Sequence, residues 1–313
     1  MSRTAVSAAL DPPAPRLDGE AEAAVVAVGL SALRREPDQK AELLSQGLFG
    51  EPLDVLDRTA DGRWLRVAGP DGYPGWTRSW SLATGTREAV AEWGRLATRF
   101  VRQPLLWTGG EAGLLPLGAR LADDPLRPGG VRGPSGAMAL RASEIRKLRP
   151  LASPPAKRRA VLKAAELLLG APYLWGGRSA AGIDCSGLVQ IAYGLCGVTL
   201  PRDARDQCAA LGGARGLRPY RPGARGGTPR PADLLFFGPE GPGGDVTHVA
   251  LSTGGPGLLH AYGSVGPGSL DPAAGDYESE LPPLVLGWAP AALAGLAQAG
   301  PATEAASRTP RTA

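Results

Sequence analysis

Apolar residues follow two different patterns along the chain, and the change between them falls near residue 150. Before this point, short alternating runs are separated by turn signals such as Asp61-Gly62 and Asp71-Gly72. This pattern is typical of antiparallel strands. The expected strands are 24–28, 53–56 and 64–67, followed by 104–107, 119–121 and 137–140. A short helix over 87–100 separates the two groups, so we predict two small all-β domains, 23–86 and 87–150.

After residue 153 the apolar spacing becomes helical. It predicts a helix over 156–169 with Gly170 after it, and a second helix from Asp184 to Gly197. The Arg/Gly/Pro-rich stretch 215–230 is expected to be a surface loop. Three strands are then predicted, at 233–237, 247–252 and 257–262. Two helices followed by an antiparallel meander indicate an α+β domain over 151–291.

Composition narrows the range of partners and compartments. The 313 residues are 43% hydrophobic and 20% charged, and the net charge is +4. This charge is small, and the sequence has no stripe of basic residues interleaved with aromatic ones. We therefore do not expect nucleic acid as a partner. Residues 1–22 and 292–313 are expected to be disordered. Met1 to Arg16 has no long apolar run and contains three prolines, so we expect no signal peptide, no membrane span and a cytoplasmic monomer. Export by another route stays open.

Cys185 is the main candidate for chemistry. Asp184 is a good N-cap residue and would place Cys185 in the first turn of a helix. There the helix dipole and free backbone N–H groups are expected to lower the pKa of the thiol and to face a developing oxyanion. The three cysteines do not resemble a disulfide framework, and Cys196 and Cys208 are interpreted as structural.

The chain contains only two histidines, His248 and His260, and both lie on predicted strands. A simple hairpin centred on Gly255 would place His248 opposite Tyr262, with His260 as its diagonal neighbour on the same face. A slip of one residue would separate the two rings. The plainer interpretation is that Cys185 is a small buried residue, that the histidines are ordinary core or surface residues, and that the aromatics near residue 175 belong to the core.

The order of short motifs resembles the NlpC family of papain-like cysteine peptidases, which cut bacterial cell-wall peptides. The motifs are Pro172-Tyr173-Leu174-Trp175-Gly176-Gly177, Asp184-Cys185-Ser186-Gly187-Leu188, Leu200-Pro201-Arg202-Asp203-Ala204, Asp233-Leu234-Leu235-Phe236-Phe237, Thr247-His248-Val249-Ala250 and Leu259-His260-Ala261. The resemblance implies a papain-like fold without metal or cofactor.

The same resemblance implies roles for individual residues. Cys185 would be the nucleophile, His248 the general base and acid, and His260 the polar residue that orients His248. Tyr173 would line the site beside the nucleophile. One departure is visible: Ala232 stands where the family often has a turn glycine before the first strand, which puts the local turn in doubt.

The N-terminal half resembles bacterial SH3-like domains in the stretches 48–53, 62–67 and 72–76, and 97–150 looks like a second, divergent copy. Two such domains before an NlpC domain resemble γ-D-glutamyl-L-diamino acid endopeptidases, which cleave murein stem peptides with a free N-terminal L-Ala. That resemblance implies substrate contacts at Asp203, for the ammonium group, and at Tyr73, Asp184 and Ser186. The expected role is recycling of murein peptides.

Three alternatives remain open at this stage. The protein could be an exported wall hydrolase whose SH3-like domains bind peptidoglycan, or a non-catalytic wall-binding module, or a transferase that uses the same thiol. The retention of Cys185, His248 and His260 together argues against the non-catalytic module.

Overall fold

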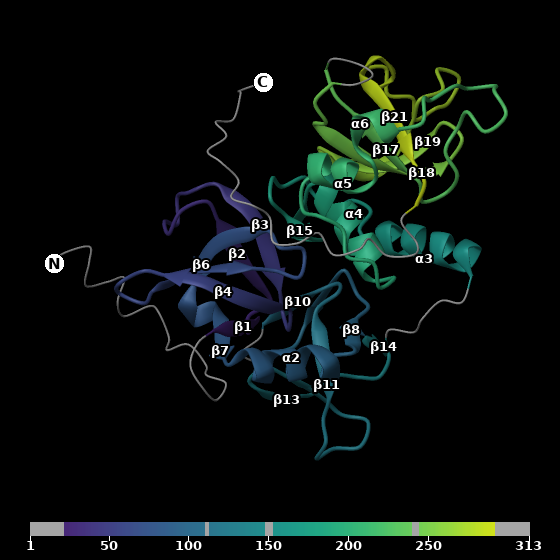
Figure 1. Cartoon of the computed structure of the whole chain (residues 1–313). Coiled ribbons are helices and arrows are strands. Elements are labelled where there is room, and N and C mark those ends of the chain that lie inside the picture. The colour runs from purple at the N-terminus through teal and green to yellow at the C-terminus, as the bar shows by residue number, and fades with distance from the viewer. Residues whose placement is uncertain (1–21, 110–112, 148–152, 240–243, 292–313) are drawn as a thin grey trace.

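The computed structural model describes residues 22–109, 113–147, 153–239 and 244–291, which form three domains (Figure 1). The predicted disordered ends, 1–22 and 292–313, lie outside the described residues except for Glu22. Among the described residues, no helix is both long and apolar enough to cross a membrane.

The first domain is a seven-stranded antiparallel sheet with the strand order β3-β2-β6-β5-β4-β1-β7. Its strands are β1 Ala23–Val26, β2 Leu30–Arg34, β3 Leu43–Leu48, β4 Pro52–Arg58, β5 Trp64–Ala68, β6 Pro74–Arg78 and β7 Leu82–Gly85, with the 3-10 turn η1 at Ser79–Ser81. Alternating side chains of these strands form one apolar core that includes Val26, Leu53 and Val67. The predicted strands are therefore present, and β2, β3, β6 and β7 are additional to them.

The second domain is also built from short strands. They are β8 Arg99–Val101, β9 Leu105–Trp107, β10 Leu114–Pro116, β11 Arg120–Asp123, β12 Val131–Gly133, β13 Gly136–Met138 and β14 Ile145–Lys147. Helix α2, Arg87–Leu96, begins at the Thr86 cap and ends four residues before the predicted end at 100. Its buried Trp93 packs between the first two domains and donates a hydrogen bond to the Gly50 carbonyl at 2.8 Å.

The third domain packs helices against one face of a five-stranded antiparallel sheet, as Figure 1 shows in green and yellow. Its helices are α3 Pro154–Glu166, α4 Cys185–Gly194, α5 Ala204–Ala210 and α6 Gly213–Gly216, with the 3-10 turn η2 at Pro282–Leu284. Its strands are the short pair β15 Arg178–Ser179 and β16 Gly182–Ile183, then β17 Leu234–Phe237, β18 His248–Gly254, β19 Gly257–Tyr262, β20 Ser264–Ser269 and β21 Val285–Ala289. The sheet order is β20-β19-β18-β17-β21. The predicted three-stranded meander thus gains one strand at each edge.

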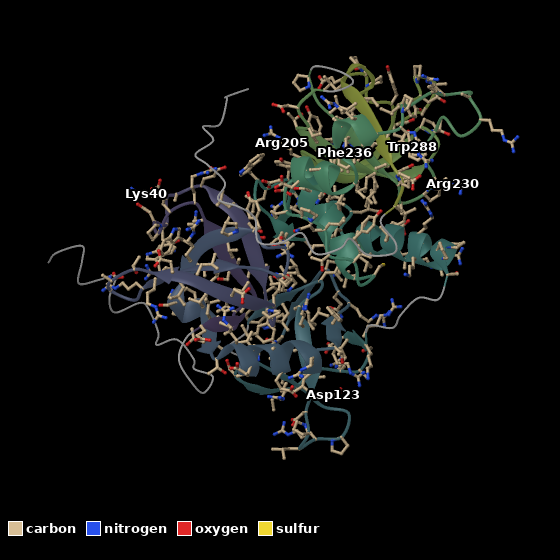
Figure 2. All side chains as sticks on the ribbon, in the orientation of Figure 1. Lys40, Asp123, Arg205, Arg230, Phe236 and Trp288 are labelled. Carbon is tan, nitrogen blue, oxygen red and sulfur yellow. The ribbon has the colours of Figure 1, made fainter. Side chains whose placement is uncertain are left out.

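Residues of β17 alternate between the two faces of this sheet. Phe236 points into the core shared with α3 and α4, whereas Phe237 packs with Trp288 on the opposite face. Figure 2 shows Phe236 and Trp288 inside this domain, while Lys40 and Asp123 lie far out on the other two. Apolar residues of α4 pack against β18 and β19 in the core of this domain.

Ala232 marks the turn that leads into β17. Its φ of 66° lies in the left-handed region, and it is the single such non-glycine residue among those described. An L-residue pays about 1–2 kcal/mol for this conformation. The turn forms nevertheless because Tyr193 donates a hydrogen bond to the Ala232 carbonyl at 2.6 Å and Asp233 accepts from the Arg230 N–H at 2.8 Å. The departure at this position therefore leaves the turn in place.

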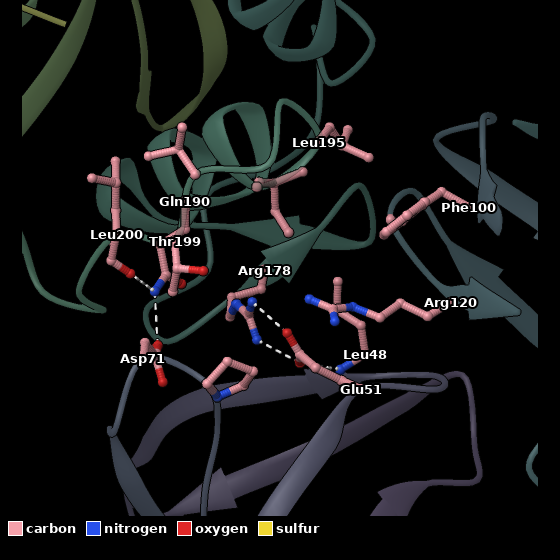
Figure 3. Close-up of a pocket in the computed structure, with 15 residues that line it drawn as sticks. Leu48, Glu51, Asp71, Phe100, Arg120, Arg178, Gln190, Leu195, Thr199 and Leu200 are labelled. Carbon is pink, nitrogen blue, oxygen red and sulfur yellow. Dashed lines mark hydrogen bonds and ion pairs between the residues drawn. The ribbon is translucent and has the colours of Figure 1, made fainter. Parts of the chain in front are cut away.

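The first domain docks on the third through a buried polar junction, drawn in Figure 3. Arg178 donates to both carboxylate oxygens of Glu51, at 2.9 and 3.1 Å, and to the Gln46 carbonyl at 2.6 Å. Gln190 on α4 donates to Asp71 at 2.8 Å. Burial alone would raise the pKa of Glu51, but Arg178, together with Arg120 and the Leu48 N–H, outweighs it and the pKa is lowered.

We expect Glu51→Ala to destabilise the protein by about 3–5 kcal/mol, because it leaves the buried Arg178 charge without a partner. The measurement is the free energy of unfolding from urea denaturation. Since the folded-state pKa is lowered, the contribution of the pair is complete above the ordinary glutamate pKa of 4.5 and is lost as pH falls through the folded-state value.

The matched control is Asp54→Ala, which breaks the exposed pair with Arg87 and should cost less than about 1 kcal/mol. Equal costs for the two variants would contradict a structural role for the junction.

Candidate active site

Cys185 is the first residue of α4. Asp184 adopts an extended conformation before the helix, and its carboxylate accepts from the Gly187 N–H at 2.7 Å, as an N-cap does. The thiol is 7% exposed and receives hydrogen bonds from the backbone N–H groups of Ser186 and Val249. It therefore lies between the start of the helix and the start of β18.

The environment changes the pKa of this thiol in the direction opposite to the sequence-based expectation. Burial, followed by the Asp184 carboxylate, raises the pKa of Cys185 to about 11. The two backbone N–H groups oppose this shift without reversing it. The expectation considered the helix start and not the desolvation of the thiol, so it was wrong. The resting sulfur is protonated at neutral pH.

His248 and His260 lie together as the predicted hairpin register requires. Leu251 pairs with Leu259 across β18 and β19, and continuing this register places His248 opposite Tyr262. The Nε2 atom of His248 lies 2.9 Å from Nδ1 of His260. Burial, followed by His260, lowers the pKa of His248 to about 3, so its imidazole is neutral at neutral pH and can accept a proton.

Glu278, which the sequence reasoning missed, lies behind His260. Its Oε1 atom is 2.7 Å from Nε2 of His260. Tyr262 stacks on His260 with ring centroids 6.2 Å apart and planes inclined by 3°. A lone glutamate in the loop after β20 carries no sequence signal of this contact.

Arg202 is a second residue that sequence reasoning did not assign. It is 1% exposed and forms a forked ion pair with Asp184, with nitrogen–oxygen distances of 3.0 and 2.6 Å. It also donates to Ser186 Oγ at 2.8 Å and to Ser45 Oγ, in the first domain, at 3.0 Å. The side chains of Asp184 and Ser186 are thus engaged with the protein, and their contact with a substrate stays a prediction.

Tyr73 and Asp203 come from different domains and meet at the site. The hydroxyl of Tyr73 donates to Asp203 Oδ2 at 2.9 Å. Burial raises the pKa of Asp203, and the Arg202 charge and the Tyr73 hydrogen bond offset only part of this. The same neighbourhood raises the pKa of Tyr73, through burial first and the Asp203 charge second. The sequence named both residues but could not show that they touch.

Tyr173 lies near the thiol on the loop after α3. Its pKa is raised by burial and then by the nearby Cys185 and Asp184 groups. Next to it, Trp175 is 61% exposed and donates from Nε1 to Glu42 of the first domain at 2.9 Å. These aromatics are therefore surface residues at the domain boundary, and the plainer interpretation of them as core residues was wrong.

The arrangement supplies a protonated thiol, a neutral imidazole, and backbone N–H groups that can face a negatively charged oxygen. A carboxylate and a phenol, Asp203 and Tyr73, meet at the domain boundary. In the described ranges, no group of three or more His, Cys, Asp and Glu side chains is arranged to hold a metal ion.

Comparison with known proteins places two domains in families. Residues 170–277 match the NlpC/P60 family, and residues 33–82 match the bacterial dipeptidyl-peptidase SH3 domain. The SH3-like character of the second domain stays a prediction. The fold of a Bacillus cereus ATCC 10987 protein of the NlpC/P60 family is similar, with a TM-score of 0.65 and 22% identity over 87% of this chain and 99% of that one.

Curated relatives agree with these domains. A γ-D-glutamyl-L-lysine dipeptidyl-peptidase of Bacillus cereus (strain ATCC 10987 / NRS 248) is 28% identical over 70% of this chain and 67% of its own length. A protein of the same name from Bacillus subtilis (strain 168) is 39% identical, but the match spans 32% of this chain and 31% of the relative. The peptidoglycan endopeptidase RipB of Mycobacterium tuberculosis (strain ATCC 25618 / H37Rv) is 35% identical over 36% of this chain and 46% of its own. We conclude that this chain carries a cysteine-peptidase domain of the NlpC/P60 family, preceded by a bacterial dipeptidyl-peptidase SH3 domain.

Proposed function

We propose that the protein hydrolyses the bond between γ-D-Glu and the diamino acid in murein stem peptides whose N-terminal L-Ala is free. The observation that carries this proposal is the Tyr73–Asp203 contact, through which the first domain meets the domain that holds Cys185. Two curated relatives named for γ-D-glutamyl-L-lysine dipeptidyl-peptidase activity support it.

Asp203 suits a primary ammonium group as its ligand. Its carboxylate is partly buried and has Tyr73 as its hydrogen-bond donor, while α5 begins immediately after it. An ammonium group would replace part of the lost hydration through a charge-assisted hydrogen bond. A peptide acylated at this amine brings no charge and more bulk, so the pocket would reject it.

In the proposed reaction, His248 removes the thiol proton as the Cys185 sulfur attacks the γ-carbonyl carbon of D-Glu. Backbone N–H groups near the start of α4 stabilise the negative oxygen. His248 then returns the proton to the amine of the diamino acid, which leaves, and a thioester remains. Water activated by His248 attacks this thioester, releases L-Ala-γ-D-Glu and restores the thiol.

We extend the proposal to murein-peptide recycling in the cytoplasm. The three cysteines are all free, which suits a reducing compartment. Cell fractionation with an antibody to the native protein tests this part, and a signal confined to the envelope or the medium would contradict it.

The central test compares cleavage of L-Ala-γ-D-Glu-L-Lys, or its diaminopimelate analogue, with the same peptides acetylated at the L-Ala amine. We expect L-Ala-γ-D-Glu from the free peptides only. Asp203→Asn should lower kcat/KM for the free peptides by roughly 10- to 150-fold, the scale of one charged hydrogen bond. Mass spectrometry of the products provides the measurement.

Two controls accompany this test. Cys185→Ala should remove all turnover, and Asp206→Asn, an exposed aspartate in the first turn of the helix that Asp203 precedes, should leave the preference for free amines unchanged. Equal cleavage of free and acetylated peptides would indicate a general wall hydrolase.

The preference for free amines should also depend on pH. Because burial raises the pKa of Asp203 above its usual 3.8, the carboxylate becomes neutral at a higher pH than an exposed aspartate. The ratio of kcat/KM for free over acetylated peptide should therefore fall as pH decreases through this raised pKa. A ratio that is constant over the acid range, or that changes identically in Asp203→Asn, would contradict the assignment.

A further inference from the structure

His260 is held at both ring nitrogens. Nδ1 lies 2.9 Å from His248 Nε2, and Nε2 lies 2.7 Å from Glu278 Oε1. His260 is 2% exposed, and the Glu278 side chain is 27% exposed. His248, His260 and Glu278 thus form one continuous row of hydrogen-bonded side chains that ends at a partly exposed carboxylate.

The contact with Glu278 determines the positions of the protons. An ionised carboxylate only accepts hydrogen bonds, so His260 must carry its proton on Nε2. Nδ1 of neutral His260 is then an acceptor and must receive the Nε2–H of His248. The remaining nitrogen of His248, Nδ1, is therefore left without a proton and can accept one from a thiol.

The surrounding backbone keeps Glu278 in this place. Its N–H donates to the Ser269 carbonyl at 3.0 Å. A Cβ atom added to Gly268 would lie 2.6 Å from Glu278 Oε1 and 3.2 Å from His260 Nε2. Gly268 therefore provides the space in which the carboxylate and the imidazole meet.

We propose that Glu278 is a positioning residue that holds both histidines in the Nε2–H tautomer and so keeps the base of the catalytic site unprotonated at Nδ1. Its effect on turnover rests on the proposed peptidase function, whereas its effect on the tautomers does not.

The chain has only two histidines, so ¹⁵N NMR of protein labelled at histidine reads each tautomer directly. We expect both to be in the Nε2–H form in the wild type. In Glu278→Gln the amide can donate to His260 as well as accept from it. In Gly268→Ala the added methyl group displaces the Glu278 carboxylate. Histidine tautomers with the proton on Nδ1 should therefore appear in both variants. Glu280→Gln removes a charge two residues away, on a side chain that contacts Tyr262, and should keep the wild-type spectrum.

Steady-state kinetics provide a second test of the role of Glu278. Glu278→Gln should lower kcat by roughly 10- to 100-fold, the usual cost of losing a partner that orients a functional histidine, while KM changes less than about twofold. Nε2–H tautomers retained in both variants would overturn the proposal. Altered tautomers in a protein that cleaves no murein peptide would contradict the proposed function and leave this inference standing.

A separate feature lies between the second domain and α3, where the structure has a cavity of about 480 Å³. The neighbouring residues Phe100 and Arg146 on β8 and β14 form one side. The α3 residues at 156, 159–160 and 163–164, with Leu167 directly after the helix, recur at helical spacing and form the other side. A surface of this spacing is one face of the helix.

Four cationic side chains line this cavity, from Arg102, Arg146, Arg159 and Lys163. Over the described residues, none of the four makes an ion pair and no acidic residue lines the cavity. Like charges that face one another across a gap repel, and a bound anion would relieve this repulsion. Val101, Leu117 and Ala164, all buried, provide apolar contacts in the same cavity.

We infer that this cavity binds an amphiphilic anion, with a phosphate or polycarboxylate group at the cationic side chains and an apolar portion against the buried wall. Its volume is that of an ordinary small-molecule site. Such a ligand would contact the second domain and the catalytic domain at once.

Cys196 offers a reporter because it lines the same cavity and is partly exposed. In a Cys185→Ala protein the remaining cysteine, Cys208, is 2% exposed. Alkylation by iodoacetamide, located by peptide mass spectrometry, should then occur at Cys196. Dodecyl phosphate below its micelle concentration should protect Cys196 in a saturable manner, and dodecyltrimethylammonium should not.

The double variant Arg159→Ser/Lys163→Ser should weaken this protection at least tenfold. Arg215→Ser/Arg225→Ser, which removes two exposed arginines elsewhere in the domain, should not change it. Equal protection by the cationic amphiphile, or protection that survives the first double variant, would overturn the inference. If inorganic phosphate protected Cys196 as well as dodecyl phosphate does, the inferred contact between an apolar portion of the ligand and the buried wall would be contradicted.

Discussion

The buried ion pair between Arg202 and Asp184 is the interaction on which the site depends. Asp184 caps α4, and the same carboxylate accepts from the Gly176 N–H at 2.9 Å. A carboxylate with so little exposure would be costly without a matching cation, and the Arg202 fork provides one. The start of α4, the loop that carries Tyr173 and the chain that leads into Asp203 are thereby tied to one point. Through Ser45, Arg202 also contacts the first domain.

Burial acts in opposite senses on the two reacting groups. It raises the pKa of the Cys185 thiol and lowers that of the His248 imidazole, so both are neutral at neutral pH. Proton transfer from sulfur to nitrogen would create two charges in a poorly hydrated place. The backbone N–H groups at the thiol are therefore important, because they favour the charged sulfur.

The domain junction makes the first domain part of the site. Arg178–Glu51, Gln190–Asp71 and Tyr73–Asp203 all join side chains that lie more than 100 positions apart in the sequence. All three contacts are partly buried at the boundary between the domains. The junction that stabilises the arrangement of domains thus also brings a phenol to a carboxylate of the catalytic domain.

The sequence by itself indicated the type of the strands and helices that it located and the cap at Asp184, because these depend on local periodicity and short turns. For the hairpin it offered a register that brings His248 to His260 and left a slip of one residue open, and the structure decided between them. The sequence also named Tyr73 and Asp203 through resemblance. The sequence did not predict the edge strands β20 and β21. Glycine and proline interrupt the apolar alternation of β20, and a long loop precedes β21. Only the tertiary structure decided the partner of Arg202, the place of Glu278 and the pKa of Cys185. Each of these depends on which distant groups exclude water from a charge, and no local pattern records that.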